Sequence, residues 1–134
     1  MRRTAVHLDI EPELAWQLYA RPENWRRWAP HMLGAWRLAG VGGEVREGAR
    51  GVAWFMGAPV PIRILRVNRG RSWGWGWANG LARFDHIVEP SEHGGCIVAL
   101  EMRAPPGIEA AMSVYGPIAT AALRRMGRVA PRDG

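Results

Sequence analysis

Apolar and polar positions alternate at the start of the chain, over residues 4–10. This period of two predicts a half-buried first strand. Over residues 12–20 the apolar residues recur every three or four positions, which predicts a helix with Pro12 in its first turn. A second short helix is expected over residues 22–28, before Pro30 ends it. The chain therefore begins with a strand and two successive helices that form a corner.

Short strands are expected in the middle of the chain. They cover residues 36–39, 44–46, 51–56 and 61–67. A break is expected at residues 57–59. The glycine-rich stretch 40–51 is interpreted as turns, because a dinucleotide-binding fingerprint would need glycine where Val45 stands. In the last of these strands the apolar phase slips by one residue, which predicts a bulge near Leu65 and Arg66.

A hairpin is expected over residues 72–88. Its first half alternates tryptophan with small residues and leads into Asn79-Gly80, the dipeptide that favours a two-residue type I′ turn. That turn would fix the register of the two strands. The pairs across the hairpin are then Trp77 with Ala82, Trp75 with Phe84 and Trp73 with His86. We expect the opposite face to meet solvent; it carries Gly74, Gly76, Arg83 and Asp85.

The last third of the chain predicts one more strand and a long helix. The strand covers Cys96–Arg103 and turns Cys96, Val98, Leu100 and Met102 to one side. The helix runs from Ile108 to about Val129, with a kink or a change of helix expected at Gly116-Pro117. Its apolar stripe holds Ile108, Met112, Tyr115, Ala119, Ala122 and Met126. We expect residues 131–134 to be frayed.

Several short segments carry a family resemblance. They are Ile10-Glu11-Pro12-Glu13, the stretch 21–30 with Trp25 and Trp28, Glu47-Gly48, Arg71-Ser72-Trp73, and His86-Ile87-Val88-Glu89-Pro90. With the order of elements, they resemble the START-like (SRPBCC) superfamily of polyketide cyclase/dehydrase and lipid-transport proteins over nearly the whole chain. Arg21 stands where that family usually has an acidic residue.

The resemblance implies an α+β helix-grip fold, in one domain over residues 1–134. In that fold a curved antiparallel sheet wraps around the long C-terminal helix, and two short helices follow the first strand. A cavity between the sheet and the helix holds lipids, polyketides, quinones or other apolar ligands. The resemblance implies no particular activity, because the family has carriers, sensors and cyclases and no shared catalytic motif.

The composition of the chain excludes several classes of binding partner. The formal net charge is +6, but all 18 basic residues are arginines scattered along the chain, so we expect a solvated surface and no nucleic-acid partner. One cysteine and four histidines without ligand spacing predict no metal site, and we expect no cofactor. Without a signal peptide or a long apolar run, we expect a cytoplasmic protein with no membrane span. The exposed edge strands of such a sheet could pair with a second copy of the chain, so a homodimer is a further possible partner.

Candidate ligand-binding residues follow from the faces of these elements. They are Trp73, Trp75, Trp77, Phe84, His86, Val98, Leu100, Met112 and Tyr115. Aromatic walls bind apolar ligands by removing their surface from water, although the same rings could simply fill the core. An imidazole at position 86 could act as general acid or base, bind a ligand carbonyl, or remain neutral against a backbone carbonyl or Tyr115.

Three functions remain in competition at this level. The leading hypothesis is the binding of an apolar small molecule, as a carrier or sensor. The second is a polyketide cyclase or dehydratase in which His86 and Tyr115 move a proton and steady an enolate. The third is an adaptor that presents its arginines to an anionic membrane, RNA or a protein, and it predicts a filled core where a ligand binder should have a void.

Overall fold

A computed structural model describes residues 1–40, 42–55, 57–77 and 80–129. One antiparallel sheet has the strand order β1-β7-β6-β5-β4-β3-β2. The strands are β1 (Arg2–Leu8), β2 (Met32–Trp36), β3 (Arg50–Phe55), β4 (Ala58–Asn68), β5 (Ser72–Trp77), β6 (Ala82–Pro90) and β7 (Cys96–Arg103). The helices are α1 (Pro12–Ala20), η1 (Pro22–Asn24), α2 (Trp25–Trp28), α3 (Pro106–Met112), η2 (Ser113–Tyr115) and α4 (Gly116–Val129).

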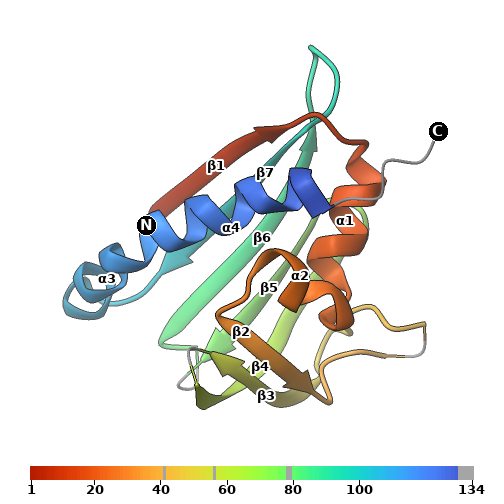
Figure 1. Cartoon of the computed structure of the whole chain (residues 1–134). Coiled ribbons are helices and arrows are strands. Elements are labelled where there is room, and N and C mark those ends of the chain that lie inside the picture. The colour runs from red at the N-terminus through yellow and green to blue at the C-terminus, as the bar shows by residue number, and fades with distance from the viewer. Residues whose placement is uncertain (41, 56, 78–79, 130–134) are drawn as a thin grey trace.

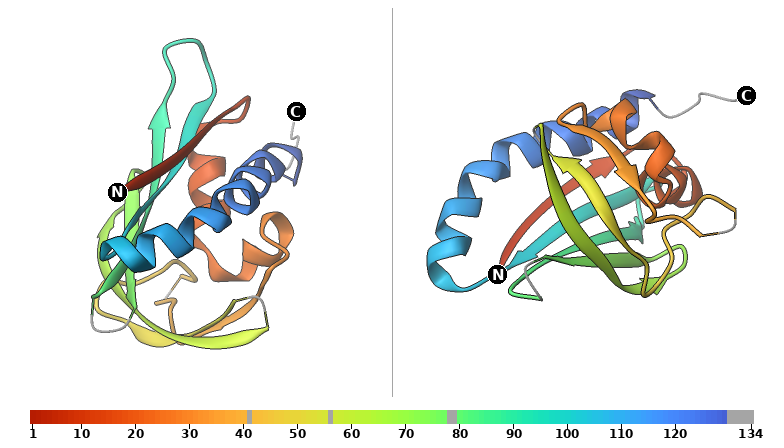
Figure 2. Two further views of the ribbon diagram at one scale, coloured as in Figure 1. Left: turned by 90° about the vertical axis from the view of Figure 1, so that its left-hand side faces the viewer. Right: turned by 90° about the horizontal axis from the view of Figure 1, so that it is seen from below.

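The sheet curves around its C-terminal helix. Figure 1 shows α4 lying across one face of the sheet, with α1 and α2 beside it. Seen from below, the strands form a curved sheet whose concave side faces α4 (Figure 2). α4 contacts β1 and β7 on one side and α2 on the other. This arrangement confirms the predicted α+β helix-grip fold.

In the N-terminal corner, the helices begin at Pro12 and Pro22, as predicted. The strand β1 begins and ends two residues earlier than predicted, whereas α1 has the predicted bounds. Arg21 is extended, with φ −104° and ψ 107°, because the residue before a proline is disfavoured in the helical region. The elements η1 and α2 together cover the predicted second helix.

The expected strand at residues 36–39 is wrong in position. The chain leaves the corner almost directly into β2, which begins at Met32, and Arg37 has a φ of +62°. A non-glycine residue in the left-handed region breaks the extended geometry, so β2 ends at Trp36. The expected strand at 44–46 is reduced to a single bridge between Ala39 and Val45. Sequence alternation alone did not reveal either change.

The strand β4 is longer than predicted: it begins at Ala58, so the expected break at residues 57–59 is wrong at Ala58 and Pro59, and it runs to Asn68. Proline cannot donate a ladder hydrogen bond and is tolerated where one side of a strand is an edge. Among the described residues, β5 pairs with β4 only from Ile62 onward, so the earlier part of β4 has such an edge. The predicted bulge is confirmed, since the register with β5 shifts between Ile64 and Arg66.

The hairpin of β5 and β6 has the predicted register: Trp77 lies opposite Ala82, Trp75 opposite Phe84 and Trp73 opposite His86. The predicted turn at Asn79 lies outside the described residues. The outer face differs from the expectation, because Gly74 and Gly76 are buried. The side chains of Asp85 and Leu65 lie over these two glycines and keep water from them.

The C-terminal helical region is interrupted as predicted. Helix α3 passes through the single turn η2 into α4 at Gly116-Pro117, because proline lacks the N–H that would continue the ladder. In α4 the buried residues recur every three or four positions, which turns one stripe toward the sheet. They are Ala119, Ala122, Leu123 and Met126. The predicted frayed end, 131–134, lies outside the described residues.

Candidate ligand-binding cavity

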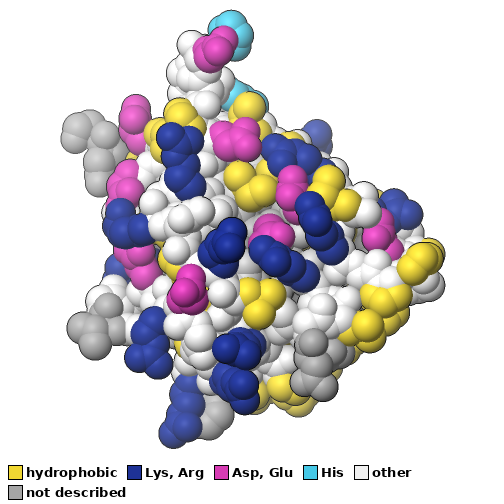
Figure 3. All heavy atoms as spheres, turned by 180° about the vertical axis from the view of Figure 1, so that it is seen from behind, with side chains coloured by type: hydrophobic (Ala, Val, Ile, Leu, Met, Phe, Trp, Pro, Cys, Tyr) yellow, Lys and Arg dark blue, Asp and Glu magenta, His cyan; other side chains and the backbone are white. Residues whose placement is uncertain are grey.

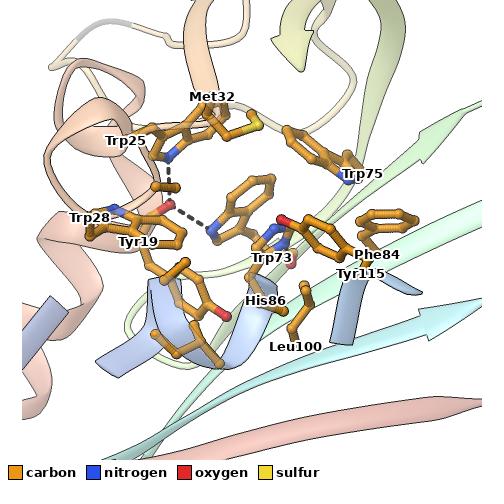
Figure 4. A pocket seen from close by; sticks show the side chains of 14 residues that line it. Tyr19, Trp25, Trp28, Met32, Trp73, Trp75, Phe84, His86, Leu100 and Tyr115 are labelled. Atoms are coloured by element: carbon orange, nitrogen blue, oxygen red, sulfur yellow. Dashed lines mark hydrogen bonds between the residues drawn. The ribbon is translucent and has the colours of Figure 1, made fainter. Parts of the chain in front are cut away.

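A small aromatic cavity lies between the sheet, α2 and α4 (Figure 4). Its volume is about 30 Å³, room for about two water molecules, whereas ligand pockets usually measure about 300–1,000 Å³. The lining residues are Tyr19, Trp25, Trp28, Ala29, Met32, Trp73, Trp75, Phe84, His86, Leu100, Tyr115, Ala119, Ala122 and Leu123. The lining draws on the main core and on a smaller cluster that includes Leu100 and Ala119.

Three indole groups fix the wall of the cavity to the end of α1. The last carbonyls of a helix have no partner within the helix. The Tyr19 carbonyl accepts hydrogen bonds from Nε1 of Trp25 at 2.9 Å and of Trp73 at 3.1 Å (Figure 4). The Leu18 carbonyl accepts one from Nε1 of Trp28 at 2.8 Å. These bonds cap the helix and orient the rings at the same time.

The rings form an ordered stack. Trp73 lies parallel to Trp25, with centroids 5.6 Å apart, and parallel to His86 on its other side at 3.8 Å. Trp75 meets Trp73 edge to face at 5.5 Å. Offset and edge-to-face geometries are the ones that aromatic quadrupoles favour. Because each ring is held by its neighbours, this side of the cavity has a defined shape.

His86 is neutral in this setting. It is 6% exposed, and burial lowers the pKa of its imidazole to about 3, although the bond to the Trp73 carbonyl opposes the shift. Its Nδ1 lies 3.2 Å from the carbonyl oxygen of Trp73. A carbonyl only accepts, so Nδ1 carries the proton and Nε2 is the acceptor. The structure records no hydrogen-bond partner for Nε2 among the described residues, which leaves this atom available to a bound molecule.

Tyr115 and His31 meet beside the cavity. The Tyr115 hydroxyl lies 2.6 Å from Nε2 of His31, and the ring centroids are 5.4 Å apart. Burial raises the pKa of Tyr115 and lowers the pKa of His31. Both side chains are therefore neutral near pH 7, and a hydrogen bond joins the hydroxyl to Nε2 of the imidazole. This bond joins η2 to the segment between α2 and β2.

Tyr19 also lines the cavity, and its hydroxyl already has a hydrogen-bond partner. Its hydroxyl donates to the carbonyl oxygen of Ala99 at 2.7 Å. Burial raises the pKa of this hydroxyl well above its usual value, with a smaller contribution from Tyr115. Within the described part of the chain, every side-chain nitrogen and oxygen that is itself shielded from solvent has a hydrogen-bond partner. The cavity wall is thus neutral and largely apolar.

Most of the predicted site residues gather around this cavity. Those that line it are Trp73, Trp75, Phe84, His86, Leu100 and Tyr115. Trp77 lies outside this lining: it is 42% exposed, because it is the last residue of β5 and lies beyond the cavity. Val98 is fully buried but belongs to the main core, where it pairs with Val6 and Val88. The side chain of Met112 lies outside the described part of the structure.

Sequence reasoning missed part of the lining. Trp25 and Trp28 are not among the predicted site residues, yet both line the cavity; their spacing of three, which puts them on one face, was the available signal. Tyr19 lay in the predicted helical stripe, without a sign that it would face a site. His31 had no local signal, because its partner is 84 residues away in the sequence.

The residues that the structure describes offer neither a metal-binding group nor a reactive thiol. No three His, Cys, Asp or Glu side chains of the described residues are grouped so that they could hold a metal ion. Cys96 is fully buried, and burial raises the pKa of its thiol to about 11, with a smaller contribution from Glu11. The thiol is therefore protonated near pH 7 and packs as a small apolar group.

A curved antiparallel sheet that holds a long helix across one face, with an aromatic cavity between them, defines the helix-grip class of proteins. Within that class, the chain belongs to the family described as polyketide cyclase / dehydrase and lipid transport, which matches residues 3–130. None of the curated proteins matches the chain. No helix in the described ranges combines the length and the apolar character that a membrane crossing requires.

Solved structures with little sequence identity have the same fold. The protein XoxI from Bacillus cereus is 15% identical, with a TM-score of 0.74 over 96% of this chain and 94% of that one. MLL2253 from Mesorhizobium loti is 13% identical, with a TM-score of 0.70 over 95% of each chain. DynU16, from the dynemicin biosynthetic locus, is 12% identical, with a TM-score of 0.71 over 94% of this chain and 45% of that one.

Proposed function

We propose that this protein binds an apolar small molecule, such as a lipid, polyketide or quinone, in the aromatic cavity, as a carrier or sensor. The observation that carries the proposal is the lining: 14 residues, mostly aromatic or aliphatic, whose polar side chains are neutral. Burying apolar surface contributes about 25 cal/mol per Å², so such a wall favours a ligand that offers a similar surface. Membership of a family that includes lipid transport supports the same class of ligand.

The cavity must widen to admit such a ligand, because about 30 Å³ holds only water-sized guests. The helix break at Gly116-Pro117 provides a hinge directly beside Tyr115. The hydrogen bond from Tyr115 to His31 is the polar link across that side of the cavity. Breaking it and turning η2 outward would enlarge the cavity without moving α4, whose buried face packs on the core.

A bound ligand would meet one available acceptor. Nε2 of His86 has no recorded partner among the described residues, and its ring is fixed by Trp73. One or two polar groups in an apolar pocket commonly orient the ligand. We therefore expect the ligand to carry a hydroxyl or phenol that donates to this nitrogen.

The cyclase or dehydratase alternative fits the same residues less well. A general acid or base works best when its pKa lies near the working pH. The pKa of His86 is lowered to about 3, so its ring is a weak base, and it is not charged near pH 7. The Tyr115 hydroxyl bonds to His31, and burial raises its pKa, which makes the phenolate harder to form. Binding without turnover is the simpler role.

The test is native mass spectrometry of the purified protein, followed by denaturing extraction of any small molecule that accompanies it. A matched pair of variants locates the site: Ala119→Leu fills the cavity from α4, and Ala121→Leu adds the same atoms on the exposed side of that helix. We expect a hydrophobic passenger in the wild type and in Ala121→Leu, and its loss in Ala119→Leu.

A naphthalene sulfonate dye provides the second measurement, with Tyr115→Ala as the variant that enlarges the cavity. Dye uptake should rise in Tyr115→Ala and fall in Ala119→Leu. If the wild type is empty, and dye binding is the same in all four proteins, the tryptophans are ordinary core and the proposal is wrong.

A further inference from the structure

Arg50 and Arg63 lie opposite each other on the outer face of the sheet. Ile62 and Ile64 are buried in the core, so the alternation of β4 turns Arg63 to the other side. Arg50 on β3 is the direct cross-strand partner of Arg63. Figure 3 shows this outer face, where arginines and carboxylates are interspersed over the strands.

The two guanidinium groups belong to a row of arginines that crosses the sheet. Arg63 lies opposite Gly76, Gly76 opposite Arg83, and Arg83 opposite Arg103. Arg83 is neutralised by Asp85, which accepts a hydrogen bond from its Nε at 3.0 Å. Arg50 and Arg63 form no ion pair with any carboxylate in the described part of the chain.

Such a pair is unfavourable by itself, since like charges directly across two strands repel each other. The arginines border a hollow of about 620 Å³ on the sheet. Gly76 also borders it, beneath the Leu65 side chain, and Pro61, Leu65 and Trp77 add apolar surface to its lining. The hollow therefore combines two uncompensated positive charges with an apolar border.

We propose that this hollow binds a phosphate monoester of a small organic molecule. The monoester carries a charge of about −1.5 to −2 near pH 7, which matches the two arginines. Guanidinium groups bind phosphate oxygens through pairs of parallel N–H donors, which lysine cannot do. The organic part of the molecule lies against Leu65 and Pro61. This site is separate from the aromatic cavity and does not depend on what the cavity holds.

The test uses phenyl phosphate as the probe, with isothermal calorimetry and thermal unfolding at constant ionic strength. Arg50→Gln and Arg63→Gln each remove one guanidinium. The charge-matched control is the double variant Arg124→Gln/Arg125→Gln, on exposed positions of α4. We expect phenyl phosphate to raise the unfolding temperature of the wild type and of the control more than sodium chloride does.

Each single variant should bind phenyl phosphate about tenfold more weakly, and the Arg50→Gln/Arg63→Gln double variant about a hundredfold, as expected for charged hydrogen bonds. Without ligand, the double variant should unfold at or above the wild-type temperature, because a repulsion is gone. Ala119→Leu should bind phenyl phosphate normally.

Three results would overturn the proposal. The first is equal stabilisation of the wild type by phenyl phosphate and by sodium chloride at one ionic strength. The second is an equal loss of binding in the α4 control, which would mean that net charge alone attracts the anion. Tighter binding of a single-stranded oligonucleotide without a terminal phosphate would also reject a phosphate monoester as the ligand.

Discussion

The two faces of one sheet have opposite chemistry. The inner face holds stacked rings, and the imidazole and phenol groups there are neutral, because burial shifts their pKa values toward the uncharged forms. The outer face carries arginines and carboxylates, some paired and some not. Neighbouring residues of a strand point to opposite sides. Consecutive residues of β5 or β6 therefore lie in different environments: one faces the neutral aromatic interior, and the next faces the charged outer surface.

Within the inner face, position along the strand matters as much as side. Trp73 and Trp77 have the same alternation on β5, yet Trp73 is 1% exposed and Trp77 is 42% exposed. The first lies among α1, α2 and His86, whereas the second ends the strand. Alternation therefore assigns a side, and the covering helices decide whether that side is core.

The largest expected effect comes from Trp73→Ala. The change removes a fully buried ring, and with it the stacking contacts to Trp25 and His86 and the hydrogen bond to the Tyr19 carbonyl. It should lower the free energy of unfolding by about 3–5 kcal/mol. Trp77→Ala is the matched control and should cost about 1 kcal/mol. Urea unfolding followed by circular dichroism measures both, and equal losses would contradict the difference between the two positions.

The second effect is a loss of stability in acid caused by His86. Its pKa is about 3 in the folded protein and about 6.5 in the unfolded chain. The unfolded state therefore binds the proton first, so the contribution of this group is fully present above pH 6.5 and declines as the pH falls toward 3. At pH 4.5 the loss should be about 2–3 kcal/mol.

His86→Gln isolates this effect, because glutamine can keep the donor to Trp73 but does not titrate. The difference in unfolding free energy between the variant and the wild type should change by about 2–3 kcal/mol between pH 7.5 and 4.5. His31→Gln serves as a control for a half-buried imidazole, whose pKa is also lowered. Parallel pH profiles for wild type and His86→Gln would mean that the pKa of His86 is the same in the folded and unfolded states.

A third, smaller effect is expected on the outer face at Gly74. A Cβ on Gly74 would collide with the Asp85 carboxylate, which holds Arg83. Gly74→Ala should therefore cost about 1–2 kcal/mol. At Gly76 the added atom would meet only the flexible end of Leu65, at 3.1 Å, and Gly76→Ala should stay within about 0.5 kcal/mol of the wild type. Thermal unfolding of both variants checks this order.

Local signals in the sequence were enough for most of the fold. Pro12 and Pro22 set the bounds of α1, the alternation of tryptophans set the register of β5 and β6, and Gly116-Pro117 marked the helix break. Each signal acts within a few residues of itself. The position of β2 could not be found this way, because Arg37 ends it through a backbone conformation that arginine rarely adopts.

Only part of the candidate site could be predicted from such local signals. The face of β5 and β6 predicted Trp73, Trp75, Phe84 and His86 together, because they share one hairpin. A neutral His86 was expected against a backbone carbonyl or Tyr115; it lies against the carbonyl of Trp73, and the Tyr115 hydroxyl instead meets His31. That contact depends on how η2 returns to the segment before β2, a long-range approach that no periodicity encodes. The same holds for the indole bonds to the end of α1.

The smallest expected effect comes from a paired charge on the outer face. Arg3 on β1 and Glu101 on β7 form a bridge of 2.6 Å, with side chains 36% and 17% exposed. Water screens such a pair, so Arg3→Gln should cost less than about 1 kcal/mol, and 1 M sodium chloride should remove most of that cost. Arg125→Gln, which breaks no recorded ion pair, is the control. A cost above about 2 kcal/mol that persists in salt would mean that the outer face also shields its charges from water, and the contrast between the two faces would fail.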